Sequence, residues 1–404
     1  MTTSLRRGAT ALLLLTSIAT PRVGAQTTAP SQAPASPYAQ LRRPTSTWSQ
    51  ADREIGFAHW DSIWPSRAVP RGTTVHPLPV GAPLAAFAPG TENAAWLDGF
   101  FDAQRVAGLL VIQDGHIRLE RYGLGYDSTK RWTSQSVSKS ITSTLVGAAL
   151  KDGYIKSLDD PVSRYVAGLR GSAYDSVTIR QLLTMTSGVR WTEVYTDTTT
   201  DTWRFYSERA PPGMTRTVSY MRKLPREAPP GTKWVYKTGE THLLGVLVAE
   251  ATKKPLSQYL SEKIWAPYGM EHDAAWELDP TNSEMAGCCL HVALRDYGRF
   301  GQFILDGAKI DGQSIVPDGY LEAATSPQVE TSIPGRSYGY QWWTSPTGRF
   351  AAIGIHGQMI DIDPKRRIVI VTSSAWPDPT SQARSEARAE LVRRITIALA
   401  RENR

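Results

Sequence analysis

The chain has 404 residues, of which 41% are hydrophobic and 21% are charged. This composition is typical of a globular protein with one large domain or two, and it excludes the disordered and fibrous classes. The formal net charge is +7 at pH 7, and the basic residues are too dispersed to favour nucleic acid as a partner.

The first residues predict a secretory signal. Arg6 and Arg7 precede a mostly apolar run from Ala11 to Ile18, and small residues lead to a cleavage site after Ala25. The apolar run is too short to span a bilayer, although a retained anchor is the alternative. We therefore expect a secreted, periplasmic protein whose signal peptide covers residues 1–25.

The two segments that follow carry no recognisable chemistry. Residues 26–47 begin with a run of Thr, Ala, Pro, Ser and Gln without periodicity, which predicts a flexible linker. Residues 48–89 are rich in Trp, Pro and Arg, and they predict an irregular lead-in that wraps the core.

A helix and a hairpin come next. Residues 92–103 have a helical pattern, and residues 106–113 form an apolar run typical of a buried strand. Asp114 and Gly115 make a strong two-residue turn signal, after which residues 117–120 alternate as a second strand should. An antiparallel hairpin is expected here.

The stretch from Trp132 to Gly147 carries the first catalytic candidates. Apolar residues recur at helical spacing from Ile141 onward, so Ser136 would open a helix and Lys139 would lie one turn further on the same side. An amine at this spacing can take the proton of the hydroxyl, and a helix N-terminus offers N–H groups to an oxyanion. This Ser-x-x-Lys pattern is typical of serine acyl-transfer enzymes, although a chain of this length contains it about once by chance.

Residues 152–330 predict a mostly helical lobe in which strand patterns are nearly absent. The predicted helical pieces are residues 158–165, 178–184, 217–223, 241–252, 255–264 and 294–305.

Two further segments offer candidates. Tyr236 lies where a loop (residues 229–239) leads into an apolar helix, and a nearby ammonium would lower its pKa and let it shuttle a proton. A core tyrosine is the alternative. In residues 352–358, two glycines permit close backbone approach, so an edge strand could offer a second N–H to an oxyanion. His356 within it is either part of the site or an ordinary strand histidine.

The only two cysteines are adjacent, at Cys288 and Cys289. Neighbouring cysteines could close only a small strained ring, so two buried free thiols are expected. The seven histidines are scattered and no Cys-x-x-Cys motif occurs, so the sequence predicts no metal site and no cofactor.

Strand patterns return near the C-terminus, at residues 349–355 and 367–373, and residues 381–401 predict a closing helix. Sheet-forming segments far apart in sequence, with helices at both ends, indicate an α+β fold. We expect an antiparallel sheet flanked by N- and C-terminal helices, with the helical lobe inserted. The active cleft would lie between sheet and lobe.

Three motifs occur in the order and separation of the signature elements of the penicillin-recognising serine hydrolases: Ser136-Val137-Ser138-Lys139, Tyr236-Lys237-Thr238 and Gly354-Ile355-His356-Gly357-Gln358. The chain therefore resembles the class C β-lactamase superfamily and, within it, most resembles the 6-aminohexanoate-dimer hydrolases. The likeness covers most of the chain from about Trp60. Satellite matches are residues 193–197, 341–343, 363–364, 373 and 376–379.

The resemblance implies a serine hydrolase domain at residues 48–404 that acts through an acyl-enzyme. Ser136 would be the nucleophile and Lys139 its base, while Tyr236 would pass a proton to the leaving group and later activate water. The backbone N–H groups of Ser136 and Ile355 would form the oxyanion hole. The residues expected at the substrate are Tyr195, Trp343, Thr238 and His356.

Departures from the family pattern bear on the substrate. Thr238 replaces an Asn of the β-lactamases, and Ile355 with His356 replaces the pair that grips the antibiotic's carboxylate. Tyr206 and Gly287 replace an acidic and a hydrogen-bonding residue of the dimer hydrolases, and a missing charge partner weakens the binding of a buried ammonium. We therefore expect the substrate to be a small molecule, either a linear amide or a carboxylic ester.

Other functions remain open. A β-lactamase or penicillin-binding peptidase would carry the same three motifs, and so would a periplasmic binding or sensor protein that is acylated once without turnover. Residues 335–339 also match the Gly-x-Ser-x-Gly elbow of α/β-hydrolases. Because Pro334 precedes this motif and no helix pattern follows it, Ser337 is not expected to be catalytic.

Overall fold

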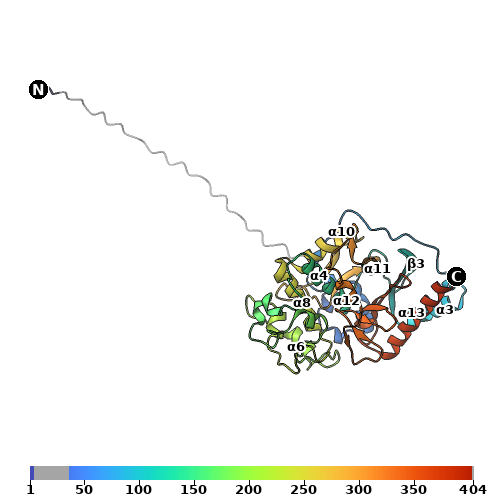
Figure 1. Ribbon diagram of the computed structural model, residues 1–404. Coiled ribbons are helices and arrows are strands. Elements are labelled where there is room, and N and C mark those ends of the chain that lie inside the picture. Colours follow the sequence, from blue (N-terminus) through green and yellow to red (C-terminus); the bar gives the residue numbers. More distant parts are fainter. Residues whose placement is uncertain (4–35, 403–404) are drawn as a thin grey trace. The chain divides into compact units, whose positions relative to one another are not determined.

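The structure is a computed structural model that describes residues 1–3 and 36–402 (Figure 1). The predicted signal peptide, apart from its first three residues, and the predicted linker as far as residue 35 lie outside the described residues. The unit that begins at Pro37 holds all of the described helices and strands.

The N-terminal part of this unit is more ordered than the sequence predicts. Helix α1 (Gln50–Ala58) begins with a capping box, in which the side chains of Ser49 and Asp52 each accept a hydrogen bond from the other residue's backbone N–H. Two 3-10 turns at residues 39–41 and 45–47 precede it, and Leu41 is buried. The linker prediction is therefore wrong for residues 37–47, because this apolar side chain anchors them to the core.

Among the described residues, eight strands form an antiparallel sheet with the order β3-β2-β14-β13-β12-β11-β10-β9. They are β2 (Val106–Gln113), β3 (His116–Tyr122), β9 (Val329–Glu330), β10 (Ser337–Tyr338), β11 (Trp343–Thr344), β12 (Phe350–Gly354), β13 (Gln358–Asp363) and β14 (Ile368–Ser374). Segments from both ends of the chain pair directly in β2 and β14, where Val371 lies opposite Leu110. The predicted antiparallel sheet and its hairpin are confirmed.

Helices cover both faces of this sheet, which explains the unbroken apolar run of β2. Leu109 and Val111 pack in one cluster with α3 (Glu92–Ala103) and α13 (Gln382–Glu402), which lie side by side in Figure 1. Leu110 and Ile112 point the other way, toward α11 (Leu294–Leu305). Alternate residues of the strand therefore enter two separate parts of the core.

A second, four-stranded antiparallel sheet has the order β1-β5-β6-β4 in the described part of the chain. Its strands are β1 (Ser66–Val69), β4 (Arg131–Thr133), β5 (Ala274–Glu277) and β6 (Leu290–Ala293). The expectation that residues 152–330 contain almost no strands is therefore wrong. β5 and β6 have only four residues each, too few to show a period, and their outer partners come from distant segments.

The helical lobe is otherwise confirmed. The longest helix of the lobe is α8 (Thr238–Thr252). The remaining elements, which are shorter, are α2 (Trp60–Ile63), α5 (Ile179–Leu183), α6 (Asp201–Ser207), α7 (Arg216–Met221), α9 (Leu256–Leu260), α10 (Ala266–Tyr268), β7 (Lys309–Ile310), β8 (Gln313–Ser314) and α12 (Tyr320–Thr325). α8 packs against α4 (Ser138–Lys151), the helix that follows the Ser-x-x-Lys serine. The predicted helix at 158–165 is reduced to a 3-10 turn at Val162–Arg164.

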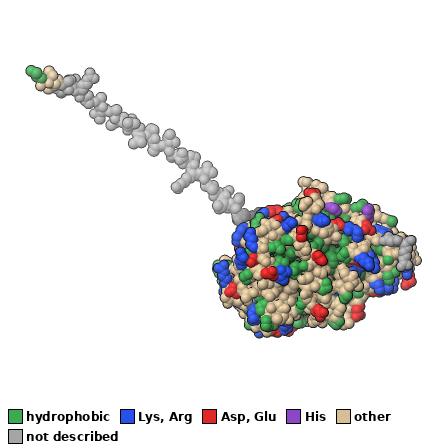
Figure 2. All heavy atoms as spheres, in the orientation of Figure 1, with side chains coloured by type: hydrophobic (Ala, Val, Ile, Leu, Met, Phe, Trp, Pro, Cys, Tyr) green, Lys and Arg blue, Asp and Glu red, His purple; other side chains and the backbone are tan. Residues whose placement is uncertain are grey.

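The surface carries charges of both signs. Figure 2 shows basic and acidic side chains interspersed over the visible face, as the dispersed sequence charge leads one to expect. Among the described helices, none combines the length and the apolar character that a membrane crossing needs.

Candidate active site

Ser136 lies in a 3-10 turn (Gln135–Val137) that leads directly into α4. Two hydrogen bonds between Ser134 and Leu290 fix the start of this turn: the Ser134 N–H donates to the Leu290 carbonyl oxygen at 2.7 Å, and the Leu290 N–H donates to Ser134 Oγ at 3.0 Å. Ser136 is therefore held between the end of β4 and the start of the buried helix α4. Its expected position at a helix N-terminus is confirmed.

Lys139 Nζ lies 3.1 Å from Ser136 Oγ. The lysine side chain is 1% exposed, and its second hydrogen bond, at 2.5 Å, goes to the carbonyl oxygen of Gly287. Among the described residues, no carboxylate lies within 4.0 Å of Nζ. Burial lowers the pKa of Lys139 from 10.5 to about 8, against a smaller opposite effect of the Glu193 charge. A substantial fraction of this amine is neutral near physiological pH and can accept a proton.

Tyr236 completes a compact group with these two residues. Tyr236 and Ser136 line the same cavity, and the Tyr236 ring centroid lies 5.3 Å from Lys139 Nζ. The ring stacks on Trp343, with centroids 5.7 Å apart. Burial, with a further contribution from the negative charge of Glu193, raises the pKa of Tyr236 well above its usual range. The expectation that an ammonium lowers this pKa is wrong, and the resting phenol is a proton donor.

A cavity of about 600 Å³ opens at this group. Its lining includes Ser136, Tyr195, Tyr236, Trp343 and Ile355, five of the residues expected at the site. One wall belongs to the lobe and the other to the end of β12, so the cavity lies where the cleft between sheet and lobe is predicted.

The end of β12 runs unusually close to the serine. A Cβ at Gly354 would lie 2.8 Å from the Ser134 carbonyl oxygen and 3.0 Å from the Ser136 backbone nitrogen, so only glycine fits there. This close approach carries the backbone of Ile355 to the cavity beside Ser136.

Two predicted substrate residues do not line the cavity. His356 adopts a left-handed backbone conformation with φ +59°, and its Nδ1 lies 2.7 Å from the carbonyl oxygen of Trp376. Burial lowers the pKa of His356 to about 4, so the ring is neutral. Thr238 donates both its backbone N–H, at 2.7 Å, and its hydroxyl to the Glu193 carboxylate. Both side chains therefore hold neighbouring segments in place.

The structure gives two residues, Glu193 and Gly287, roles at the site that the sequence does not predict. Glu193 lines the cavity and accepts hydrogen bonds from the hydroxyl of Tyr195 and from Trp191 Nε1. Gly287, 148 residues from Lys139 in sequence, supplies the carbonyl that holds the amine. A backbone carbonyl at that separation leaves no pattern in the sequence. The pairing of Glu193 with the nearby Tyr195 could have been guessed from their spacing.

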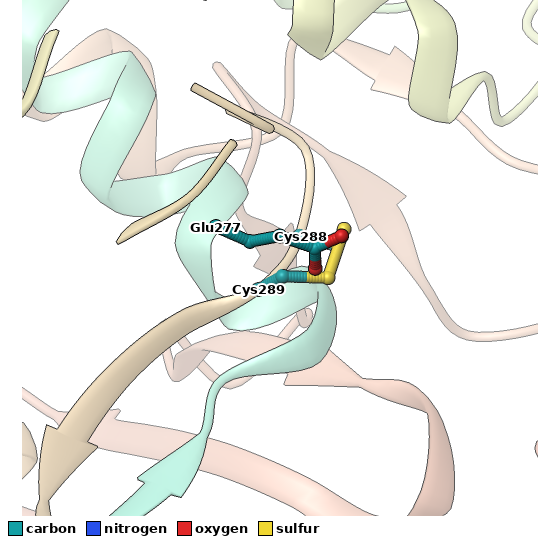
Figure 3. Close-up of side chains that lie close together, drawn as sticks. All are labelled: Glu277, Cys288 and Cys289. Atoms are coloured by element: carbon teal, nitrogen blue, oxygen red, sulfur yellow. A yellow bond between two sulfur atoms is a disulfide. The ribbon is translucent and has the colours of Figure 1, made fainter. Parts of the chain in front are cut away.

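Cys288 and Cys289 form a disulfide, so the prediction of two free thiols is wrong. A left-handed backbone at Cys289, with φ +70°, turns its side chain to the same side as that of Cys288. The carboxylate of Glu277 lies beside the pair (Figure 3), and burial raises the pKa of Glu277 to about 7. Because the sulfurs are bonded to each other, they are not thiolate ligands for a metal.

Nearby, Tyr206 places its hydroxyl 3.7 Å from Cys288 Sγ. Gly287 has no room for a side chain, since a Cβ would meet the Thr238 carbonyl oxygen at 2.9 Å. Ser337 lies in β10 between two other short strands, with no helix after it, as its unsuitable sequence context predicts.

The fold and the Ser-Lys-Tyr group together define a serine hydrolase of the penicillin-recognising class. The family model described as Beta-lactamase matches residues 94–394, and the chain belongs to this family.

Two relatives are 6-aminohexanoate-dimer hydrolases by name. The one from Paenarthrobacter ureafaciens is 29% identical over 367 residues, which cover 86% of this chain and 92% of that protein. A solved structure from Bacillus anthracis, assigned to the same enzymes, aligns with a TM-score of 0.74 and 22% identity over 93% of this chain and 99% of that one. A D-stereospecific amidohydrolase from Streptomyces aligns with a TM-score of 0.55 and 20% identity over 71% of this chain and 94% of that one.

Proposed function

We propose that this protein hydrolyses a linear amide or a carboxylic ester through an acyl-enzyme on Ser136. The observation that carries the proposal is the 3.1 Å contact between Ser136 Oγ and the amine of Lys139, buried without a carboxylate partner among the described residues. The names of the relatives from Paenarthrobacter and Streptomyces support amide chemistry.

Each proton has a place in the proposed reaction. Lys139 takes the Ser136 proton as Oγ attacks the substrate carbonyl carbon, and the N–H groups of Ser136 and Ile355 hold the oxyanion. Tyr236 gives its proton to the leaving nitrogen or oxygen and regains one from Lys139. In the second half, the same groups take a proton from water as it attacks the ester, and they return a proton to Ser136.

The pocket supports an open-chain substrate better than a bicyclic antibiotic. The backbone N–H of Thr238 is already bound to Glu193, and the His356 ring is turned to Trp376, so neither offers a grip on a β-lactam carboxylate. Aromatic walls from Tyr195, Tyr236 and Trp343 suit an extended acyl chain or a planar leaving group.

The test is a multiple-turnover assay with a p-nitrophenyl ester, a linear anilide and a penicillin. We expect steady release from the ester and the anilide that exceeds release from the penicillin, with all turnover lost in Ser136→Ala and retained in Ser337→Ala. A single burst stoichiometric with protein would indicate an acylated sensor. Preferential penicillin turnover would indicate a β-lactamase, and activity retained in Ser136→Ala would overturn the proposal.

We also propose that the protein is exported and cleaved after Ala25. The support is the order of residues in the leader, with Arg6 and Arg7 before a short apolar run. The N-terminal residue of the mature protein recovered from the periplasm should be Gln26. A full-length N-terminus retained in the cytoplasm would contradict export.

A further inference from the structure

The backbone of Gly287 is hydrogen-bonded through both of its polar groups. Its carbonyl oxygen accepts from Lys139 Nζ at 2.5 Å, and its N–H donates to Nδ1 of His242 at 3.1 Å. One residue therefore connects an imidazole on α8 to the amine that contacts Ser136. His242 has no step in the proposed reaction, so its contact with Gly287 calls for an explanation.

The carbonyl of a glycine must be held in place by its surroundings, because a residue without a Cβ has wide backbone freedom. The peptide group between Ala286 and Gly287 is fixed at both ends. The Ala286 carbonyl oxygen accepts from Thr142 Oγ1 of α4 at 2.9 Å, and the Gly287 N–H donates to His242. Anchoring this peptide group restricts how far the adjoining Gly287 carbonyl can turn away from Lys139.

His242 is suited to accept this N–H because its ring is neutral. The side chain is 1% exposed and stacks on Phe205 of α6, with ring centroids 4.9 Å apart. Burial, together with the positive charges of Lys139 and Arg216, lowers the pKa of His242 well below its usual value. Nδ1 receives an N–H and therefore carries no proton. Nε2 has no hydrogen-bond partner among the described residues, so Gly287 is the polar contact that orients the ring.

Helix α8 supports both groups that move protons in the proposed reaction. Tyr236 lies two residues before the start of α8, and His242 lies on the same face of the helix as Thr238. A Cβ at Gly287 would lie 2.9 Å from the Thr238 carbonyl oxygen and 3.3 Å from His242 Cε1, so this face packs directly against the glycine. Lys139 is therefore tied to α8 through Gly287, while Tyr236 is tied to it through the chain.

We propose that His242 is a positioning residue for catalysis, which fixes the Gly287 backbone and thereby holds the Lys139 amine at Ser136 Oγ. His242 does not line the catalytic cavity, so it acts through Lys139 and not on the substrate. The inference rests on the proposed hydrolase function, in which Lys139 is the base. It adds a residue that none of the three motifs contains.

Two variants of matched shape test the inference. Leucine and asparagine branch at the same carbon, but only asparagine offers an acceptor, Oδ1, at the place of Nδ1. We expect His242→Leu to lower kcat by about 10- to 100-fold, because the amine is misplaced, and to change KM by less than about twofold. The ascending limb of the pH profile of kcat should move to lower pH by about half a unit, since a hydrogen bond to a carbonyl favours the ammonium form. His242→Asn should recover most of both losses.

His291→Leu is the control for the loss of a buried imidazole. His291 is 0% exposed, and Lys139 is not among the charged groups that act on it. This variant should keep kcat and its pH profile. Wild-type kinetics in His242→Leu, or equal losses in His242→Leu and His242→Asn, would overturn the inference while leaving the hydrolase function intact. Absence of turnover in the wild type would instead remove the proposed function.

A spectroscopic measurement on the wild type needs neither turnover nor a variant that folds. In protein with 15N-labelled histidine, the His242 signals are assigned through their contact with the Phe205 ring. They should show a neutral ring with its proton on Nε2 between about pH 6 and pH 9. A proton on Nδ1, or a ring that becomes charged in this range, would contradict the inference whether or not the protein is active.

Discussion

Two buried lysines at the starts of two neighbouring helices have opposite surroundings. Lys139 and Lys237 are 1% and 0% exposed, and each is paired with a residue three positions along the chain. Lys237 Nζ lies 3.5 Å from the carboxylate of Glu240, whereas Lys139 Nζ contacts the hydroxyl of Ser136. A buried cation with a counter-ion is a structural element, and one without a counter-ion readily gives up its proton. The partner therefore separates the two roles.

The largest expected effect comes from Lys139→Met. Turnover should fall by about 10³-fold or more, because the serine loses its base. The free energy of unfolding at pH 7 should not fall, since methionine removes an unpaired buried charge at similar volume. Steady-state kinetics and denaturant unfolding of the same preparation check both. Near-normal turnover would refute the role of the amine, and a large loss of stability would show that its hydrogen bond to the Gly287 carbonyl outweighs the missing carboxylate partner.

The same variant has a pH signature in stability. The folded pKa of Lys139 is about 8 and the unfolded value 10.5, so between these pH values the unfolded chain binds more protons and stability rises with pH. Between these pH values, the free energy of unfolding of the wild type should rise by about 3 kcal/mol relative to that of Lys139→Met. A difference between the two proteins that does not change with pH would contradict the lowered pKa.

Lys237→Met, unlike Lys139→Met, should lower the free energy of unfolding. It leaves the buried carboxylate of Glu240 unpaired, and breaking such a pair costs about 3–5 kcal/mol of stability. The double variant Lys237→Met with Glu240→Leu should recover much of the loss, because no lone charge remains. Unfolding curves of the three proteins decide the matter. A stable single variant would remove the contrast between the two lysines.

Gly287→Ala probes how Lys139 is held. The new Cβ would approach the Thr238 carbonyl oxygen to 2.9 Å and displace the Gly287 carbonyl that accepts from Nζ. A small misplacement of the base should lower kcat by about 10²-fold. Gly99→Ala, at an exposed position of α3 where a new Cβ would have no neighbour within 4 Å, is the control for loss of a glycine. Unchanged kcat in Gly287→Ala would show that this carbonyl does not position the amine.

The smallest effect is expected from Glu193→Gln. The Glu193 charge raises the pKa of Lys139. Removing that charge should therefore move the ascending limb of the pH profile of kcat/KM to lower pH by up to about one unit. Glu227→Gln, which removes an exposed carboxylate paired with Lys233, should leave the limb in place. A shift toward higher pH in Glu193→Gln would contradict the assignment of the limb to the amine.

The sequence predicts those features of this molecule that depend on local pattern. The spacing of Ser136 and Lys139, the run of β2 and the Asp114-Gly115 turn all depend on residues a few positions apart, and the structure places each as expected. The helix at residues 294–305 has the same bounds in the structure as in the prediction.

Features that depend on distant partners are missing from the prediction. The sequence does not predict β13, where Arg349, the residue before β12, binds both Asp361 and Asp363. The disulfide between Cys288 and Cys289 goes with a left-handed backbone at Cys289, which no neighbouring glycine or turn motif announces. The position of the Lys139 amine depends on a hydrogen bond to the carbonyl oxygen of Gly287, which is distant in sequence. None of these contacts has a periodic signal.

The most direct test is the pH dependence of Ser136 acylation, followed by intact mass within a single turnover. The rate should rise about tenfold per pH unit below about pH 8 and level off above it, because only the neutral amine at position 139 accepts the serine proton. Peptide mapping should place the acyl group on Ser136. A rate that does not change between pH 6 and pH 9, or an adduct on another residue, would contradict the account.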